Sequence, residues 1–256
     1  EQCAWSLLHA EEAGLLGPDP LAPLRDGLRE ALAGLPPHAA DRCWAEAREA
    51  YARGRIGTVE EAAAATWRWR DGGFPHLVQL VGPSGSGKST FGRALAAGAV
   101  VSLDELRAAR GARADQRANG DVLREGLDRL DAALAAAGGT PGSPGTPGTV
   151  VWDATSLTVQ QRSLVRAVAA RRDALVSQVV VLVEEDELVR RNRARAHPVP
   201  PEVLTGQLRR FVPPYPGQEA HRTWYVGAGG RIEDVAGGLA DRGAGRAVAG
   251  RVGEEA

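Results

Sequence analysis

Hydrophobic and polar positions divide the chain into two regions with different periodicities. Residues 1–70 are dominated by Ala, Leu, Arg and Glu and have no alternating pattern, which is typical of helices. Gly and Pro residues divide this region into four expected helices, at 4–16, at about 21–35, from an N-cap at Asp41, and from Thr58. We expect the tryptophans of this region, Trp44, Trp67 and Trp69, to pack between helices rather than to stack on bases.

From Leu77 onward short apolar runs alternate with helical patterns. The apolar runs predict strands at 77–81, 100–103, 149–152, 176–183 and 223–226. The helical patterns between and after them lie at 88–97, 120–137, 159–172, 187–195 and 202–211. This alternation predicts an α/β fold with a mostly parallel sheet flanked by helices, preceded by a small helical segment. Active sites of such sheets lie at the carboxyl ends of the strands.

These patterns suggest three parts: a helical segment at 1–72, an α/β domain at 73–236 and a flexible tail at 237–256. The run at 138–148 consists of Gly, Pro, Ser and Thr and predicts a flexible excursion before the third strand. Because the chain starts at Glu1 and contains no Met, we expect it to be a fragment whose helical leader could end an upstream domain.

Composition narrows the class of protein. With 43% hydrophobic and 25% charged residues the chain is unlike a disordered protein. It contains no apolar run of about 18 residues, so we expect no membrane span. The absence of a secretory signal and the presence of only two cysteines, Cys3 and Cys43, favour a reduced, cytoplasmic protein. The net charge of −1 means that a nucleic-acid partner would need a local basic patch.

A phosphate-binding motif follows the first predicted strand. It matches G-x-x-x-x-G-K-[ST] and consists of Gly82, Pro83, Ser84, Gly85, Ser86, Gly87, Lys88 and Ser89, followed by Thr90. Its glycines allow backbone N–H groups to surround a phosphate. Lys88, the only lysine of the chain, should reach the β- and γ-phosphates of ATP, and the Ser89 hydroxyl should bind Mg²⁺. The alternative is a Gly-rich strand-to-helix turn with an incidental lysine.

Two further strands are followed by charged residues. Asp104 should lie at the carboxyl end of the second strand, where a carboxylate can accept the proton of an attacking hydroxyl, and Arg107 one helical turn later suits an acceptor phosphate. Alternatively, Asp104 caps the next helix and Arg107 faces solvent. Asp153 ends the third strand and could hold a Mg²⁺-bound water or a neighbouring group, or be a turn residue.

A basic stretch follows the fourth strand. Residues 188–211 contain six arginines and one acid, Glu202. Arg191 and Arg195 are four residues apart and should share a helix face. Such a helix can close over a nucleotide and bring arginines to its γ-phosphate, although a solvated basic face is the simpler interpretation.

In this order the motifs resemble the kinase domain of phage and bacterial polynucleotide 5′-hydroxyl kinases, over residues 77 to about 226. The matching segments are GPSGSGKST, S-x-D-x-x-R at 102–107, VWDAT at 151–155, R-N-x-x-R at 191–195 and VPPEVL at 199–204. The resemblance implies Asp104 as general base, Arg107 as acceptor clamp, Asp153 as a supporting residue, and Arg191 and Arg195 as lid arginines. Ser156 departs from the pattern, because relatives often carry asparagine there, and the Pro-Gly insertion is unexpected.

Three functional hypotheses follow. The first is transfer of the γ-phosphoryl group of ATP, with Mg²⁺, to the 5′-hydroxyl of RNA or DNA, in some relatives with a fused repair domain. The second keeps the kinase but makes the acceptor a small metabolite or an antibiotic. The third is a non-catalytic nucleotide-binding switch. The five histidines, His9, His38, His76, His197 and His221, lack metal-ligand spacing and are expected to be surface residues or to be satisfied by hydrogen bonds.

Overall fold

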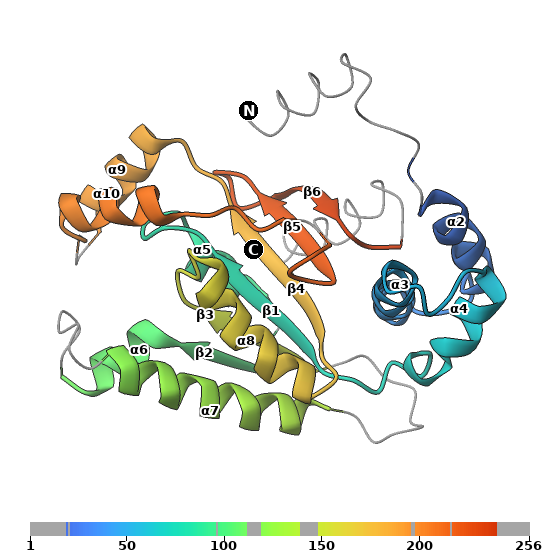
Figure 1. The fold of residues 1–256 in the computed structure, drawn as a ribbon. Helices are drawn as coiled ribbons and strands as arrows, with labels where there is room; N and C mark the ends of the chain where they lie inside the picture. The colour runs from blue at the N-terminus through green and yellow to red at the C-terminus, as the bar shows by residue number, and fades with distance from the viewer. Residues whose placement is uncertain are drawn as a thin grey trace, which may run out of the picture.

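The computed structural model describes residues 19, 21–95, 97–111, 119–138, 148–195, 198–215 and 217–239, and its centre is a six-stranded sheet (Figure 1). The strands are β1 His76–Val81, β2 Ala99–Ser102, β3 Thr149–Asp153, β4 Leu175–Val181, β5 Arg222–Val226 and β6 Ile232–Ala236. Their order is β2-β3-β1-β4-β5-β6, and every pair is parallel except β5 with β6. The mostly parallel α/β fold is therefore confirmed, with an antiparallel edge strand that the apolar pattern did not predict.

Six helices accompany the strands in the described part of the α/β region. They are α5 Lys88–Ala94, α6 Leu103–Ala109, α7 Asn119–Ala137, α8 Val159–Arg171, α9 Glu185–Arg193 and α10 Pro201–Arg210. Five of them match the predicted helices to within a few residues, and α6 is additional. Helix α6 begins directly after β2, so the strand predicted at 100–103 ends one residue early and Leu103 is already helical.

Each face of the sheet has its own apolar core. On one face Leu77 and Trp152 pack with residues of α6, α7 and α8, including Leu130. On the other face Leu80 and Val179 pack with Phe91 of α5. Because β1 and β4 are buried along their whole length, their sequences are nearly continuous apolar runs.

The amino-terminal helices form a third cluster, at the end of the sheet opposite to α9 and α10 (Figure 1). They are α2 Ala22–Ala31, α3 Pro37–Ala52, α4 Val59–Ala65 and the 3₁₀ helix η1 Trp67–Trp69. Their core contains Leu28 and Trp44 and reaches the first residue of β4, Leu175. Thr58 opens α4, as predicted, and forms a capping box with Glu61.

Some expectations for this region were wrong. Asp41 is not an N-cap, because α3 begins at Pro37 and Asp41 is buried inside the helix, where it pairs with Arg222. Trp67 is 73% exposed, whereas Trp44 and Trp69 are buried as expected. The predicted helix at 4–16, most of the run at 138–148 and most of the tail at 237–256 lie outside the described residues. Within the described part of the chain, no helix combines the length and the apolar character needed to cross a membrane.

Candidate active site

The loop after β1 has the conformation of a phosphate cradle. Gly82, Gly85 and Gly87 have φ values of 151°, 85° and 99°, a region that side-chain-bearing residues rarely adopt. The Gly82 N–H donates to the carbonyl oxygen of Thr155 at 3.0 Å, which joins the loop to the segment after β3. The Ser86 hydroxyl is buried inside the loop without a hydrogen-bond partner in the described part of the chain. A phosphate oxygen would supply that partner, so the loop fits an anion.

Lys88 is the first residue of α5, and its side chain is buried. Burial lowers the pKa of the Lys88 ammonium, and the carboxylates of Asp153 and Asp104 act in the opposite direction. Arg195 lowers the same pKa further. The charges of Asp153, Asp104 and Arg195, all predicted for the site, therefore act on Lys88.

Ser89 and Asp153 are brought together by α5 and β3. The Ser89 hydroxyl donates to Oδ1 of Asp153 at 3.0 Å. Asp153 is also in register with Ser102 of β2, so the end of β2 reaches the same edge of the sheet. A hydroxyl and a carboxylate are oxygen ligands of the kind that Mg²⁺ prefers, so the pair fits the predicted metal site.

The position of Asp104 differs from the prediction in one respect. The strand β2 ends at Ser102, whose side chain accepts the Glu105 N–H and caps α6. Asp104 therefore lies in the first turn of a helix rather than on the strand, and it is not the cap. Its side chain is 70% exposed and accepts a hydrogen bond from Nη1 of Arg107 at 2.5 Å. The two predicted acceptor residues thus form an ion pair.

The two predicted lid arginines lie beside the phosphate loop in different ways. Arg191 of α9 donates to Oε1 of Glu187 at 2.6 Å, to the Ser86 carbonyl oxygen at 3.4 Å and to the Ala228 carbonyl oxygen at 2.8 Å. Its guanidinium therefore contacts the backbone of the loop directly. Arg195 follows the end of α9, is exposed, and acts on Lys88 through its charge.

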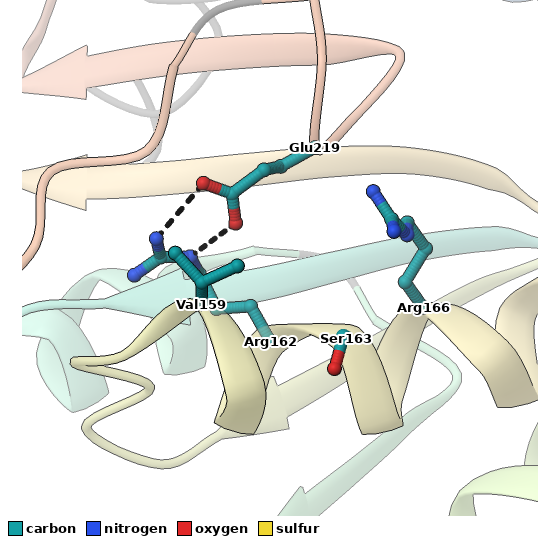
Figure 2. A pocket seen from close by; sticks show the side chains of 5 residues that line it. All are labelled: Val159, Arg162, Ser163, Arg166 and Glu219. Atoms are coloured by element: carbon teal, nitrogen blue, oxygen red, sulfur yellow. Dashed lines mark hydrogen bonds and ion pairs between the residues drawn. The ribbon is translucent and has the colours of Figure 1, made fainter.

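Two residues at this edge of the sheet were not predicted. Gln207 of α10 accepts a hydrogen bond from the Ser84 N–H of the phosphate loop at 2.8 Å. Arg162 of α8 is buried and forms an ion pair with Glu219, which Figure 2 shows beside a small surface pocket. Neither contact has a signal in sequence spacing, because each joins residues 57 or more positions apart.

Taken together, the switch from β1 into a glycine-rich loop, the buried lysine and the hydroxyl–carboxylate pair define a protein with a P-loop kinase fold. A family model described as an AAA domain (AAA_33) matches residues 77–214, which is more than half of the chain. The chain belongs to this family. The resemblance to polynucleotide kinases is thus supported at the level of the P-loop kinase fold, and the acceptor is a separate question.

Several solved structures have similar folds. A sugar kinase from Janibacter sp. HTCC2649 is 19% identical, with 60% of this chain and 86% of that chain covered and a TM-score of 0.45. The Mycobacterium tuberculosis APS kinase is 20% identical, covering 47% and 70%, with a TM-score of 0.38. The tunicamycin resistance protein of Deinococcus radiodurans is 15% identical, covering 70% and 96%, with a TM-score of 0.42. No curated protein matched the chain. The sequence identities and TM-scores of these structures are low, so they do not indicate the function of this chain.

Proposed function

We propose that the protein transfers the γ-phosphoryl group of ATP to a hydroxyl group of an acceptor. The observation that carries this proposal is the buried Lys88 next to the Ser89–Asp153 pair, with Asp104 at the neighbouring strand-to-helix junction acting on Lys88 through its charge. A nucleotide-binding switch needs Lys88, Ser89 and Asp153 to bind the nucleotide. It has no role for a further carboxylate such as Asp104 beside the transferred phosphate.

On the donor side, the N–H groups of the loop and the Lys88 ammonium bind phosphate oxygens. Burial makes this charge effective, because little water competes for it. Ser89 and Asp153 would hold Mg²⁺, which when bound neutralises charge on the phosphates. Arg195, which is exposed and acts on Lys88 through its charge, can move onto the outer phosphate as the nucleotide binds.

On the acceptor side, Asp104 orients the hydroxyl and accepts its proton as the phosphoryl group leaves ATP. Its exposure leaves room for an acceptor from solvent. Arg107 holds one carboxylate oxygen of Asp104, so the other oxygen is the one available to the acceptor. Arg107 acts in this arrangement by orienting the base.

The same ion pair favours a small hydroxyl-bearing acceptor, such as a metabolite or an antibiotic. A polynucleotide end requires a clamp for the phosphate next to its hydroxyl, and the residue expected for that role, Arg107, is engaged with Asp104. The 5′-hydroxyl of RNA or DNA is our second candidate. It is supported by the order of the sequence motifs and by exposed arginines of α9 and α10, among them Arg193 and Arg209, which could follow a phosphate backbone.

The test is incubation with γ-labelled ATP, Mg²⁺ and a mixture of 5′-hydroxyl RNA, 5′-hydroxyl DNA and small alcohols including sugars and nucleosides. We expect label on a small alcohol; label on an oligonucleotide end would select the second candidate. Lys88→Ala is the control and should abolish transfer while the fold is retained. ATP binding without label on any acceptor, or transfer that survives in Lys88→Ala, would contradict the proposed function.

A further inference from the structure

The helices α9 and α10 lie together at the end of the sheet away from α2, α3 and α4 (Figure 1), and α9 is packed against the phosphate loop. A Cβ atom on Gly85 would lie 3.5 Å from the Leu188 carbonyl oxygen and 3.6 Å from Cβ of Asn192. Arg191 adds its hydrogen bond to the Ser86 carbonyl oxygen. We call α9 and α10 the lid helices, and the first of them contacts the loop in this structure.

The Asn192 side chain joins α9 to the segment just before α10. The carboxamide of Asn192, a buried residue, donates to the Val199 carbonyl oxygen at 2.7 Å and accepts the Val199 N–H at 3.0 Å. Both ends of this carboxamide are used, so it ties Val199, two residues before α10, to α9.

Gln207, a residue of α10, contacts the phosphate loop with its side chain. The Ser84 N–H can only donate, so the atom of Gln207 that faces it is the carbonyl oxygen Oε1, at 2.8 Å. The amide nitrogen Nε2 has no protein partner among the described residues. Anchoring Oε1 thus leaves two N–H donors in a restricted orientation beside a loop whose function is to bind phosphate oxygens.

We propose that Gln207 completes the phosphate site from the lid and that its Nε2 donates a hydrogen bond to the terminal phosphate of ATP. This inference rests on the proposed function and assigns a residue that distinguishes ATP from ADP. A neutral carboxamide suits the position, because it accepts from the Ser84 N–H and donates to an anion with the same planar group. An arginine or lysine has no acceptor for the Ser84 amide.

Two substitutions separate the anchor from the donor. Gln207→Glu keeps an oxygen that can accept the Ser84 N–H but removes both N–H donors and places a carboxylate near the terminal phosphate. Gln207→Ala removes anchor and donor together. The matched control is Thr205→Glu, which adds the same charge on an exposed position of the same helix.

The measurement is the dissociation constant of a fluorescent non-hydrolysable ATP analogue and of fluorescent ADP, each with Mg²⁺, on proteins with unchanged circular dichroism. We expect Gln207→Glu to weaken the ATP analogue about ten- to hundredfold and ADP by less than about threefold. Gln207→Ala should weaken the ATP analogue about tenfold, and Thr205→Glu should change neither nucleotide.

Three results would overturn the inference. In the first, both Gln207 variants bind the ATP analogue as wild type does. In the second, they lose ATP and ADP affinity equally, which would make Gln207 a structural contact of the lid. In the third, Thr205→Glu reproduces the loss, which would make it a general charge effect. Wild-type protein that binds neither nucleotide would contradict the proposed function itself.

Discussion

At the scale of single residues, Ser156 has an unusual backbone conformation. Its φ of 48° lies in the left-handed region, and the residue is buried in the middle of the connection from β3 to α8. A non-glycine residue in this conformation costs about 1–2 kcal/mol. Asparagine tolerates it better than serine does, which gives a physical reason for the asparagine that the resemblance leads one to expect at this position.

Replacing Ser156 with glycine should therefore stabilise the protein. We expect Ser156→Gly to raise the free energy of unfolding by up to about 1 kcal/mol, because relief of the left-handed strain exceeds the added flexibility of the unfolded chain. Thermal or urea denaturation measures the change. The matched control is Ser163→Gly inside α8, which should lower stability by about 0.5–1 kcal/mol. A loss of stability in Ser156→Gly comparable to that of the control would contradict this account of the turn.

At the scale of elements, Arg162 ties three segments to α8. Its Nη1 donates to the carbonyl oxygens of Ser156, Leu157 and Val212 at 3.1, 3.1 and 2.9 Å, and its Nε and Nη2 donate to the two carboxylate oxygens of Glu219 (Figure 2). Residues 156 and 157 follow Asp153, and Val212 lies just after α10. The buried guanidinium thus joins the end of α10 to the segment that follows Asp153, a candidate metal ligand.

Removal of the Arg162 charge should lower the stability of the folded protein. Arg162→Met should lower the free energy of unfolding by about 3–5 kcal/mol, because it leaves Glu219 without its partner and removes the Arg162 donor from the Ser156 and Val212 carbonyl oxygens, while Leu157 still accepts the Val212 N–H. Arg166→Met, one turn further along α8, is the control and should change stability by less than about 1 kcal/mol, since Arg166 is exposed and donates only to the Gln218 carbonyl oxygen. Denaturation of both variants, together with the double variant Arg162→Met/Glu219→Leu, checks the cause. The double variant should regain part of the loss, and a double variant less stable than Arg162→Met would contradict the charge argument.

Local sequence signals explain which elements could be predicted. The strands β1, β3 and β4 are buried apolar runs, and the phosphate loop has fixed glycine positions. These strands and the loop could therefore be predicted from the sequence. The edge strand β6 is partly exposed and has a mixed sequence, and α6 is too short for its period to be visible. The interior position of Asp41 and the contact of Gln207 depend on distant partners, so no local pattern indicates them.

At the scale of the whole molecule, a buried polar network joins the amino-terminal helices to the sheet. Arg222 of β5 donates to Oδ2 of Asp41 on α3 and to the Ser177 hydroxyl, which also hydrogen-bonds Nε2 of His76 at 2.8 Å. His221 accepts the Val176 N–H at 3.0 Å. Burial holds the pKa values of His76 and His221 well below the usual histidine value, and the charge of Arg222 lowers both further.

Stability should therefore depend on pH in the range where histidine titrates. Both histidines are neutral in the folded protein but take up protons in the unfolded chain below pH of about 6.5, so their contribution is full above that pH and is lost as the pH falls. Each histidine should contribute a slope of up to about 1.4 kcal/mol per pH unit. Urea denaturation between pH 7.5 and about 5 measures it.

The control for this prediction is His76→Gln, which removes one of the two titrating groups and should make the slope shallower. If the free energy of unfolding were constant over this range, or if the variant had the slope of the wild type, the neutral state inferred for His76 would be wrong.

The central claim at this scale is that the phosphate loop and the acceptor residue form one catalytic centre. The most direct test is Asp104→Asn, with the rate of phosphoryl transfer and the affinity for ATP measured on the same preparation in the presence of Mg²⁺. The account predicts that turnover falls by about 10²–10⁴-fold while ATP affinity changes by less than about threefold. Equal losses of turnover and of ATP affinity, or turnover unchanged from wild type, would contradict it.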